Sequence, residues 1–171
     1  MDSAQFWRII DLLDWEGDGG DQAVLEPAIA ALSELPQEEI AAFEELLSQK
    51  LFALDTLAHA SNVGEDAYVD KSEYFSVDTF LYARCCVVAN GEALYTSVLE
   101  HPSEFPKDVE FEALLSLASA AYERKTGVAP EEFETSVSYE TFSNEAGWAP
   151  QVAPSARKPP SSPFWKFWSR P

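Results

Sequence analysis

The chain has 171 residues, of which 46% are hydrophobic and 13% aromatic, so it can build one buried core and is not expected to be disordered throughout. Its 30 acidic and 11 basic residues give a formal net charge of −19. Because binding to free DNA or RNA needs Lys and Arg at the phosphates, this charge argues against a nucleic-acid partner. We expect neither a leader nor a membrane span, because the sequence has no charged-then-apolar start and no apolar run near ~18 residues.

The first 60 residues contain three predicted helices. The first covers residues 6–13 and ends at the glycine-rich 17–20, and the second runs from 21 or 26 to 35 with Pro27 in its first turn. The third, over 37–60, is the clearest, because its apolar residues alternate by three and four. These residues are Ile40, Phe43, Leu47, Leu51, Leu54 and Ala58.

The next 80 residues alternate between loops and further helices. A polar loop covers 61–75, Ser76 caps a buried helix that ends near 90–91, and a short helix follows at 93–99. Asp108 is predicted to cap a helix that ends before Gly127, and one more turn is expected at 130–133. Only residues 135–141 have a β-like composition.

The pattern predicts a mostly α fold. We expect a single compact acidic domain of about five to seven helices over residues 1–149, followed by a disordered tail over 150–171. Cys85 and Cys86 are adjacent in an apolar run, a geometry that rarely forms a disulfide. They are therefore expected to be reduced thiols in a cytoplasmic protein.

Three segments together resemble a known bacterial family. They are Phe6-Trp7-x-x-Ile10, the helix that contains Phe43 and Leu51, and the run Asp78-x-Phe80-x-x-x-Arg84 … Gly91 … Tyr95 … Pro102. In their order and spacing they resemble the family known as domain of unknown function 4240, over about residues 1–127. The resemblance implies a small, mostly helical cytoplasmic protein. It implies no reaction, cofactor or catalytic residue.

A weak metal-site candidate lies between the first two predicted helices. Asp14, Glu16, Asp18 and Gly19 occupy positions 1, 3, 5 and 6 of a calcium-type loop. Position 12, which should be a bidentate glutamate, is Leu25. We therefore expect an acidic inter-helix turn and no specific metal.

Arg84 interrupts an apolar helix, so its guanidinium must be paired or reach solvent. One interpretation is a structural ion pair with Asp55 or Asp78. The other is a pocket in which Arg84 holds a carboxylate or phosphate. An enzyme site would then be assembled from Arg84, Asp55, His59 and Tyr95.

The last 21 residues differ from all that precede them. Residues 151–171 contain four basic groups and no acid, so they carry +4 while the preceding 150 residues carry −23. Their aromatic cluster is Phe164-Trp165-Lys166-Phe167-Trp168. This tail is predicted to dock on a protein partner, to lie on an anionic membrane surface, or otherwise to be a poorly ordered extension or to fold back on the acidic domain.

The leading functional hypothesis is a non-enzymatic binding or adaptor protein without cofactor. The acidic domain suits the neutralisation of a basic protein partner, as an immunity protein neutralises a toxin. The alternatives are an enzyme with its site around Arg84 and a peripheral membrane protein tethered by its aromatic tail.

Overall fold

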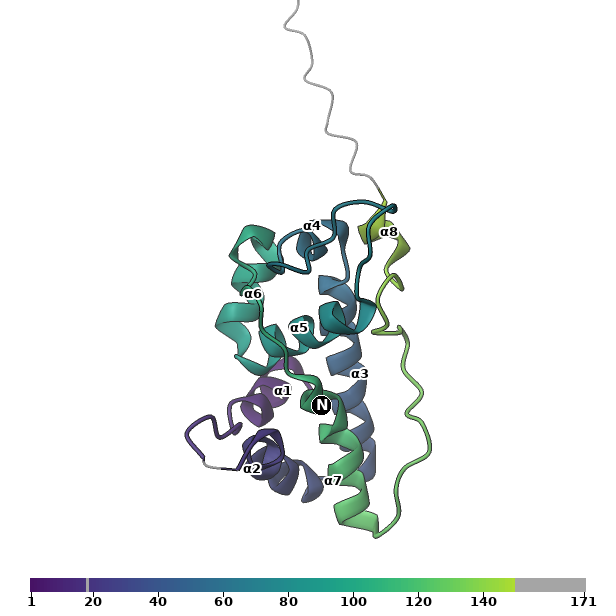
Figure 1. The fold of residues 1–171 in the computed structure, drawn as a ribbon. Helices are drawn as coiled ribbons and strands as arrows, with labels where there is room; N and C mark the ends of the chain where they lie inside the picture. Colours follow the sequence, from purple (N-terminus) through teal and green to yellow (C-terminus); the bar gives the residue numbers. More distant parts are fainter. Residues whose placement is uncertain (18, 150–171) are drawn as a thin grey trace, which may run out of the picture.

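The computed structural model describes residues 1–17 and 19–149, and within these ranges it contains eight α-helices, two short 3-10 segments and no strand. The mostly α fold is therefore confirmed. Figure 1 shows the helices gathered into one bundle around the long α3. The elements are α1 (Ser3–Ile10), α2 (Asp21–Ser33), α3 (Gln37–Leu54), α4 (Leu57–Ala60), α5 (Val77–Ala89), α6 (Glu92–Glu100), η1 (Pro102–Glu104), η2 (Glu112–Ser116), α7 (Leu117–Thr126) and α8 (Glu145–Trp148).

Capping and apolar spacing explain why α1 forms. The Asp2 carboxylate accepts from the Gln5 N–H at 2.8 Å, and the Gln5 side chain accepts from the Asp2 N–H at 2.9 Å, which satisfies two free donors at the helix start. The apolar side of α1 packs against α2 and α3. There the Phe6 ring stacks on Phe43 of α3, with centroids 4.8 Å apart.

Helix α5 is the most buried element, and it packs against α3, α6 and η2. As predicted, the Ser76 hydroxyl caps it by accepting from the Thr79 N–H at 3.2 Å. Its two cysteines are free thiols. Within the described ranges, none of the helices combines the length and apolar character needed to cross a membrane.

The predicted helix over 37–60 is interrupted, which the sequence pattern did not indicate. Helix α3 ends at Leu54, Asp55 leaves the helical region with ψ 71°, and Thr56 starts the single-turn α4 by accepting from the His59 N–H at 3.3 Å. The apolar stripe continues across the break, so spacing alone could not reveal it. The helix breaks where the Asp55 carboxylate accepts hydrogen bonds from residues 142–148, which lie far along the chain.

Of the two starts predicted for the second helix, residue 21 is confirmed, because α2 begins at Asp21, after Gly20 with φ 72°. Pro27 therefore lies in the second turn of α2 and not in the first. The helix start predicted at Asp108 is wrong. Asp108 does not cap a helix. Its backbone has φ 56°, and its carboxylate accepts from the Glu65 N–H at 2.7 Å, so it joins two loops.

Residues 128–149, which we call the strap, leave the end of α7 and run along α3 to the top of the bundle (Figure 1). The further turn predicted at 130–133 does not form, and the β-like segment 135–141 pairs with no described strand. The strap instead uses side-chain hydrogen bonds to the bundle, and its last residues form the single-turn α8.

Candidate functional site

Asp55 is a buried carboxylate that fastens the strap. Its Oδ1 accepts from the Phe142 N–H at 3.2 Å and from the Trp148 indole N–H at 2.7 Å, and its Oδ2 accepts from the Asn144 N–H at 2.9 Å. Asn144 also donates to the Phe52 carbonyl at 3.1 Å. A carboxylate that receives three donors is well satisfied, so the role of Asp55 is to position the strap.

Arg84 is fully buried beside Asp55 and also contacts the strap. It donates to the Leu51 carbonyl and to the Thr141 hydroxyl, each at 2.9 Å, and its guanidinium lies 4.7 Å from the centroid of the Phe80 ring. Burial lowers the pKa of Arg84 to about 10, opposed by the negative charge of Asp55. Within the described residues it makes no direct ion pair, so the pairing predicted with Asp55 or Asp78 is replaced by these contacts.

His59 serves the same packed core. Its Nε2–H donates to the Val98 carbonyl at 3.1 Å, and its Nδ1 lies 2.7 Å from the Thr56 hydroxyl, from which it accepts in the neutral form of the ring. Burial lowers the pKa of His59, which stabilises the same neutral form. These bonds join α4 to α6.

Tyr95 lies elsewhere, against α1 and α3. Its ring is 5.3 Å from Trp7, and the Lys50 ammonium lies 5.1 Å from the Tyr95 centroid and 4.6 Å from that of Trp7. Burial raises the pKa of Tyr95 to about 12. Thus Asp55, Arg84 and His59 occupy one packed region, and Tyr95 occupies another.

Three hollows on the described surface are lined by other residues, and none of them includes Asp55, Arg84, His59 or Tyr95. Asp55 and Arg84 bond to the strap, His59 joins α4 to α6, and the Tyr95 hydroxyl donates to the Lys50 carbonyl of α3, while the buried Arg84 Nε has no partner among the described residues. The packing therefore gives no support to an enzyme site around Arg84.

The weak metal candidate forms an ordinary turn at its start, where the Glu16 N–H donates to the Asp14 carboxylate at 3.2 Å. Asp18 lies outside the described residues, as do the five tail residues Phe164, Trp165, Lys166, Phe167 and Trp168. Within residues 1–17 and 19–149, no group of three His, Cys, Asp or Glu side chains is placed to hold a metal ion.

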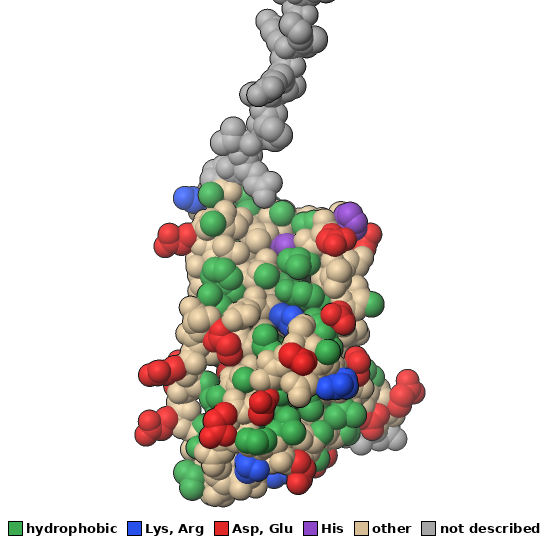
Figure 2. All heavy atoms as spheres, turned by 180° about the vertical axis from the view of Figure 1, so that it is seen from behind, with side chains coloured by type: hydrophobic (Ala, Val, Ile, Leu, Met, Phe, Trp, Pro, Cys, Tyr) green, Lys and Arg blue, Asp and Glu red, His purple; other side chains and the backbone are tan. Residues whose placement is uncertain are grey.

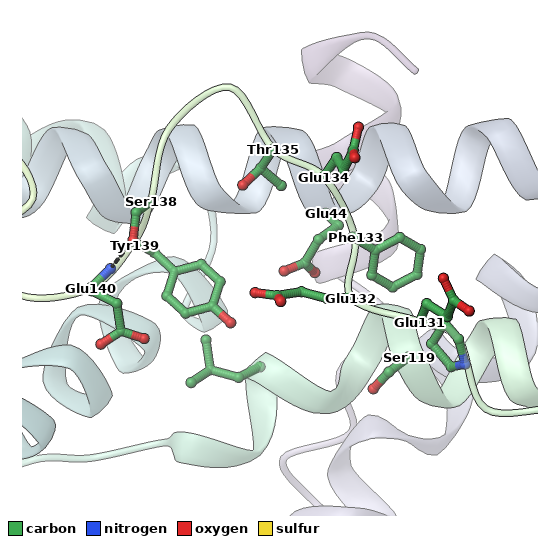
Figure 3. Close-up of a pocket in the computed structure, with 12 residues that line it drawn as sticks. Glu44, Ser119, Glu131, Glu132, Phe133, Glu134, Thr135, Ser138, Tyr139 and Glu140 are labelled. Carbon is green, nitrogen blue, oxygen red and sulfur yellow. Dashed lines mark hydrogen bonds between the residues drawn. The ribbon is translucent and has the colours of Figure 1, made fainter.

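A cavity of about 860 Å³ lies between α3, the start of α7 and the strap. Figure 3 shows the Glu44 side chain entering it from α3 and the Glu132 side chain entering it from the strap. Among the described residues that line it there is no Lys, Arg or His, so its charge is entirely negative. The glutamates are Glu44, Glu131, Glu132, Glu134 and Glu140.

Glu44 is the unusual member of this set. The other four glutamates lie on the strap and are exposed, whereas Glu44 lies on α3 and is only 6% exposed. Its Oε2 is buried and has no hydrogen-bond partner among the described residues. Burial raises the pKa of Glu44 to about 7.

Sequence reasoning missed this cavity, although one signal was present. Glu44 directly follows Phe43 and precedes Leu47 by three residues, so it occupies a core-facing position on the apolar stripe of α3. An acid at such a position is a candidate buried carboxyl. The sequence gives no signal for the strap side of the cavity, because residues 130–133 are predicted to form one more helical turn.

Fold and cavity together define an acidic all-α protein with a negatively charged hollow beneath a C-terminal strap. The family described as "Protein of unknown function (DUF4240)" matches residues 1–124, and the chain belongs to that family. The match ends within α7, so the strap lies outside it. No curated protein and no solved structure matches the chain.

Proposed function

We propose that this chain is a non-enzymatic binding protein whose acidic domain neutralises a basic protein partner, of which an immunity protein for a basic toxin is the most specific version. The observation that carries this proposal is the uncompensated charge of the strap. Residues 128–149 contain five glutamates and no Lys or Arg.

The rest of the described surface adds to this negative field. Figure 2 shows many acidic side chains and few basic ones on the face turned away from the view of Figure 1. In the described ranges only two ion pairs form, Met1 amino group to Glu39 and Arg124 to Glu26, each at 2.7 Å. Most acids therefore remain free to interact with an external cation.

The strap also holds its charges in fixed positions. Glu45 of α3 accepts from the Ser136 N–H at 2.7 Å, the Phe133 ring packs edge-on against Tyr122 of α7 with centroids 6.0 Å apart, and Asp55 fastens the far end. A row of charges that is already ordered loses less conformational entropy on binding than a flexible acidic segment does.

Affinity capture from host lysate with three matched proteins tests the proposal. They are the full chain, a chain ending at Pro150, and the full chain with E131Q/E132Q/E134Q. The control is E34Q/E73Q/E100Q, which removes three exposed acids from elsewhere on the domain. We expect one basic protein to be retained by the full chain, the shortened chain and the control, to be released as salt rises, and to be lost from the strap variant.

Two results would contradict this function. Retention of the same partner by E131Q/E132Q/E134Q would remove the strap from the interface. Loss of the partner only from the chain ending at Pro150 would assign recognition to residues 151–171 and support the predicted role of the aromatic tail.

A further inference from the structure

The Glu44 carboxyl is a buried acid with an unused oxygen at the inner wall of an open cavity. Glu44 is only 6% exposed, and its buried Oε2 has no hydrogen-bond partner among the described residues. A buried carboxylate without partners is costly to the fold, whereas a cation that reaches it removes that cost. The arrangement therefore favours occupation by a positively charged group.

The lining has the composition of a site for a cation that carries an apolar stem. In Figure 3 the side chains of Glu44 and Glu132 extend into the same space, and the Tyr139 hydroxyl points toward it. Leu115 and the Phe133 ring supply apolar wall next to these groups. A volume of about 860 Å³ lies within the range of small-molecule pockets, roughly 300–1,000 Å³.

A bare metal ion fits this lining less well. The described part of the chain contains no cluster of three ligating side chains at metal spacing. Carboxylates that are spread around apolar wall suit a larger cation, whose charge is met by one or two acids while its stem covers Leu115 and Phe133.

We propose that this cavity binds an organic cation, a primary ammonium or guanidinium group on an aliphatic stem, with the charged group seated at Glu44 and Glu132. Binding of a small cation here goes beyond the function proposed above, because it does not require the basic protein partner. The same chemistry has two sources, a free amine or a Lys or Arg side chain of that partner.

Proton and ligand compete for Glu44. Two other titratable groups face it from the elements around it, the Cys85 thiol on α5 and the Tyr139 phenol on the strap, and Glu132 and Glu140 on the strap add nearby charge. Burial raises the pKa of Cys85 to about 12 and also raises that of Tyr139, so both remain neutral near pH 7. With the pKa of Glu44 at about 7, the site gains its inner charge as pH rises through neutrality.

Isothermal titration calorimetry of the full chain tests this site with two probes, agmatine and a capped Ala-Arg-Ala peptide, and with the neutral amide acetamide as a control ligand. The variants are E44Q, which keeps the shape of the side chain, and the matched control E100Q, an exposed glutamate on α6. We expect a cationic probe to bind the wild type and E100Q at millimolar concentration or below. Binding to E44Q should be at least about tenfold weaker.

Two further readouts identify Glu44 as the binding group. Wild-type affinity should fall by about tenfold or more between pH 8 and pH 5.5, because protonated Glu44 cannot pair with the cation. Titrations near pH 7 in buffers of different ionisation enthalpy should show proton release on binding to the wild type and none with E44Q. Agmatine binding without peptide binding identifies a free amine, and the reverse identifies a side chain of a partner.

The proposed site is wrong if neither cationic probe binds at pH 8, if acetamide binds as well as they do, or if E44Q and E100Q bind equally. These calorimetric results do not depend on the result of the affinity capture from lysate described above. Agmatine binding with no captured protein leaves the cavity site intact and removes the proposed function, and capture of a basic protein with no probe binding does the opposite.

Discussion

The helical bundle and the strap are held in place by different forces. The bundle, residues 1–126, buries a continuous apolar core that reaches from α1 to α7. The strap buries less: Phe133, Tyr139 and Trp148 pack against the core, and hydrogen bonds to Asp55, Arg84 and Glu45 fix it at separate polar points. An apolar core tolerates local change by repacking, whereas a segment held at a few polar points depends on each of them.

The bundle contributes most of the buried core and therefore most of the stability, whereas the strap carries most of the charges proposed to bind a partner. The bundle is the part that matches the family, and the strap carries the acids that line the cavity. Among the glutamates that line the cavity, Glu44 is the one that lies on a bundle helix. Variants that change only the bundle or only the strap therefore test whether the two regions are held by different forces.

The largest effect is expected from the core. Phe43→Ala removes a fully buried ring that stacks on Phe6, and the cavity left behind should lower the free energy of unfolding by about 3–5 kcal/mol. Phe142→Ala in the strap removes a ring that is 44% exposed and should cost less than about 1.5 kcal/mol. Urea denaturation of both variants measures the difference, and equal losses would show that the strap is part of the cooperative core.

The next effect is the release of the strap. Asp55→Ala leaves the donors of Phe142, Asn144 and Trp148 without their acceptor, which should cost about 3 kcal/mol locally. Hydrogen exchange should then accelerate across residues 142–149 while the amides of α3 and α5 stay protected. Asp78→Ala, at an exposed position in the first turn of α5, is the control and should leave the strap protected. Uniform acceleration across the whole chain would contradict a locally anchored strap.

Glu44 should make stability depend on pH. Its pKa is raised from 4.5 to about 7 in the folded protein, so the folded state holds the proton more tightly. The resulting stability is fully present below about pH 4.5 and is lost as pH rises through about 7. Glu44→Gln removes this loss, because an amide does not ionise. Burying the amide also costs some free energy, so we expect the free energy of unfolding of the variant at pH 8 to exceed that of the wild type by about 2 kcal/mol.

Thermal denaturation of both proteins at several pH values measures this difference. It should be largest near pH 8 and shrink toward pH 5, because the wild-type carboxyl is then protonated and resembles the amide. A constant difference across the range would mean that Glu44 does not titrate near neutrality, and no difference at pH 8 would mean that its charge is already compensated.

The bundle could largely be predicted from the sequence because its signals are local. Apolar spacing located α1, α3 and α5, and the hydroxyl of Ser76 located the start of α5. The interruption between α3 and α4 could not be predicted from such local signals. The apolar stripe continues through Asp55 to Ala58, and only the strap, about 90 residues later, shows why the helix stops there.

Only the α3 side of the cavity could be predicted from the sequence, and the strap side could not. The position of Glu44 on the stripe of α3 is visible in the printed sequence, and it indicates a buried acid. The strap residues opposite it have no periodicity, since an extended segment without a partner strand follows the surface of the bundle. Their place is set by contacts such as those of Thr141 with Arg84 and Val77, which no local pattern records.

The smallest effect should come from Ser136, where the strap meets Glu45. Its hydroxyl and its backbone N–H both donate to the Glu45 carboxylate, and the N–H bond measures 2.7 Å. Ser136→Ala removes the hydroxyl and keeps the N–H, and the site is exposed to water. The change in the free energy of unfolding should therefore stay below about 0.5 kcal/mol.

Hydrogen exchange of the strap amides in Ser136→Ala tests whether the strap is held at separate points. If the strap is held at separate points, Ser136→Ala should accelerate exchange by about twofold over residues 135–137 and leave 142–149 unchanged, because Asp55 still holds that end. Acceleration along the whole strap would instead show that its anchors act as one unit. In that case the walls of the cavity would order and release together, and a cation bound at Glu44 would protect the strap over its full length.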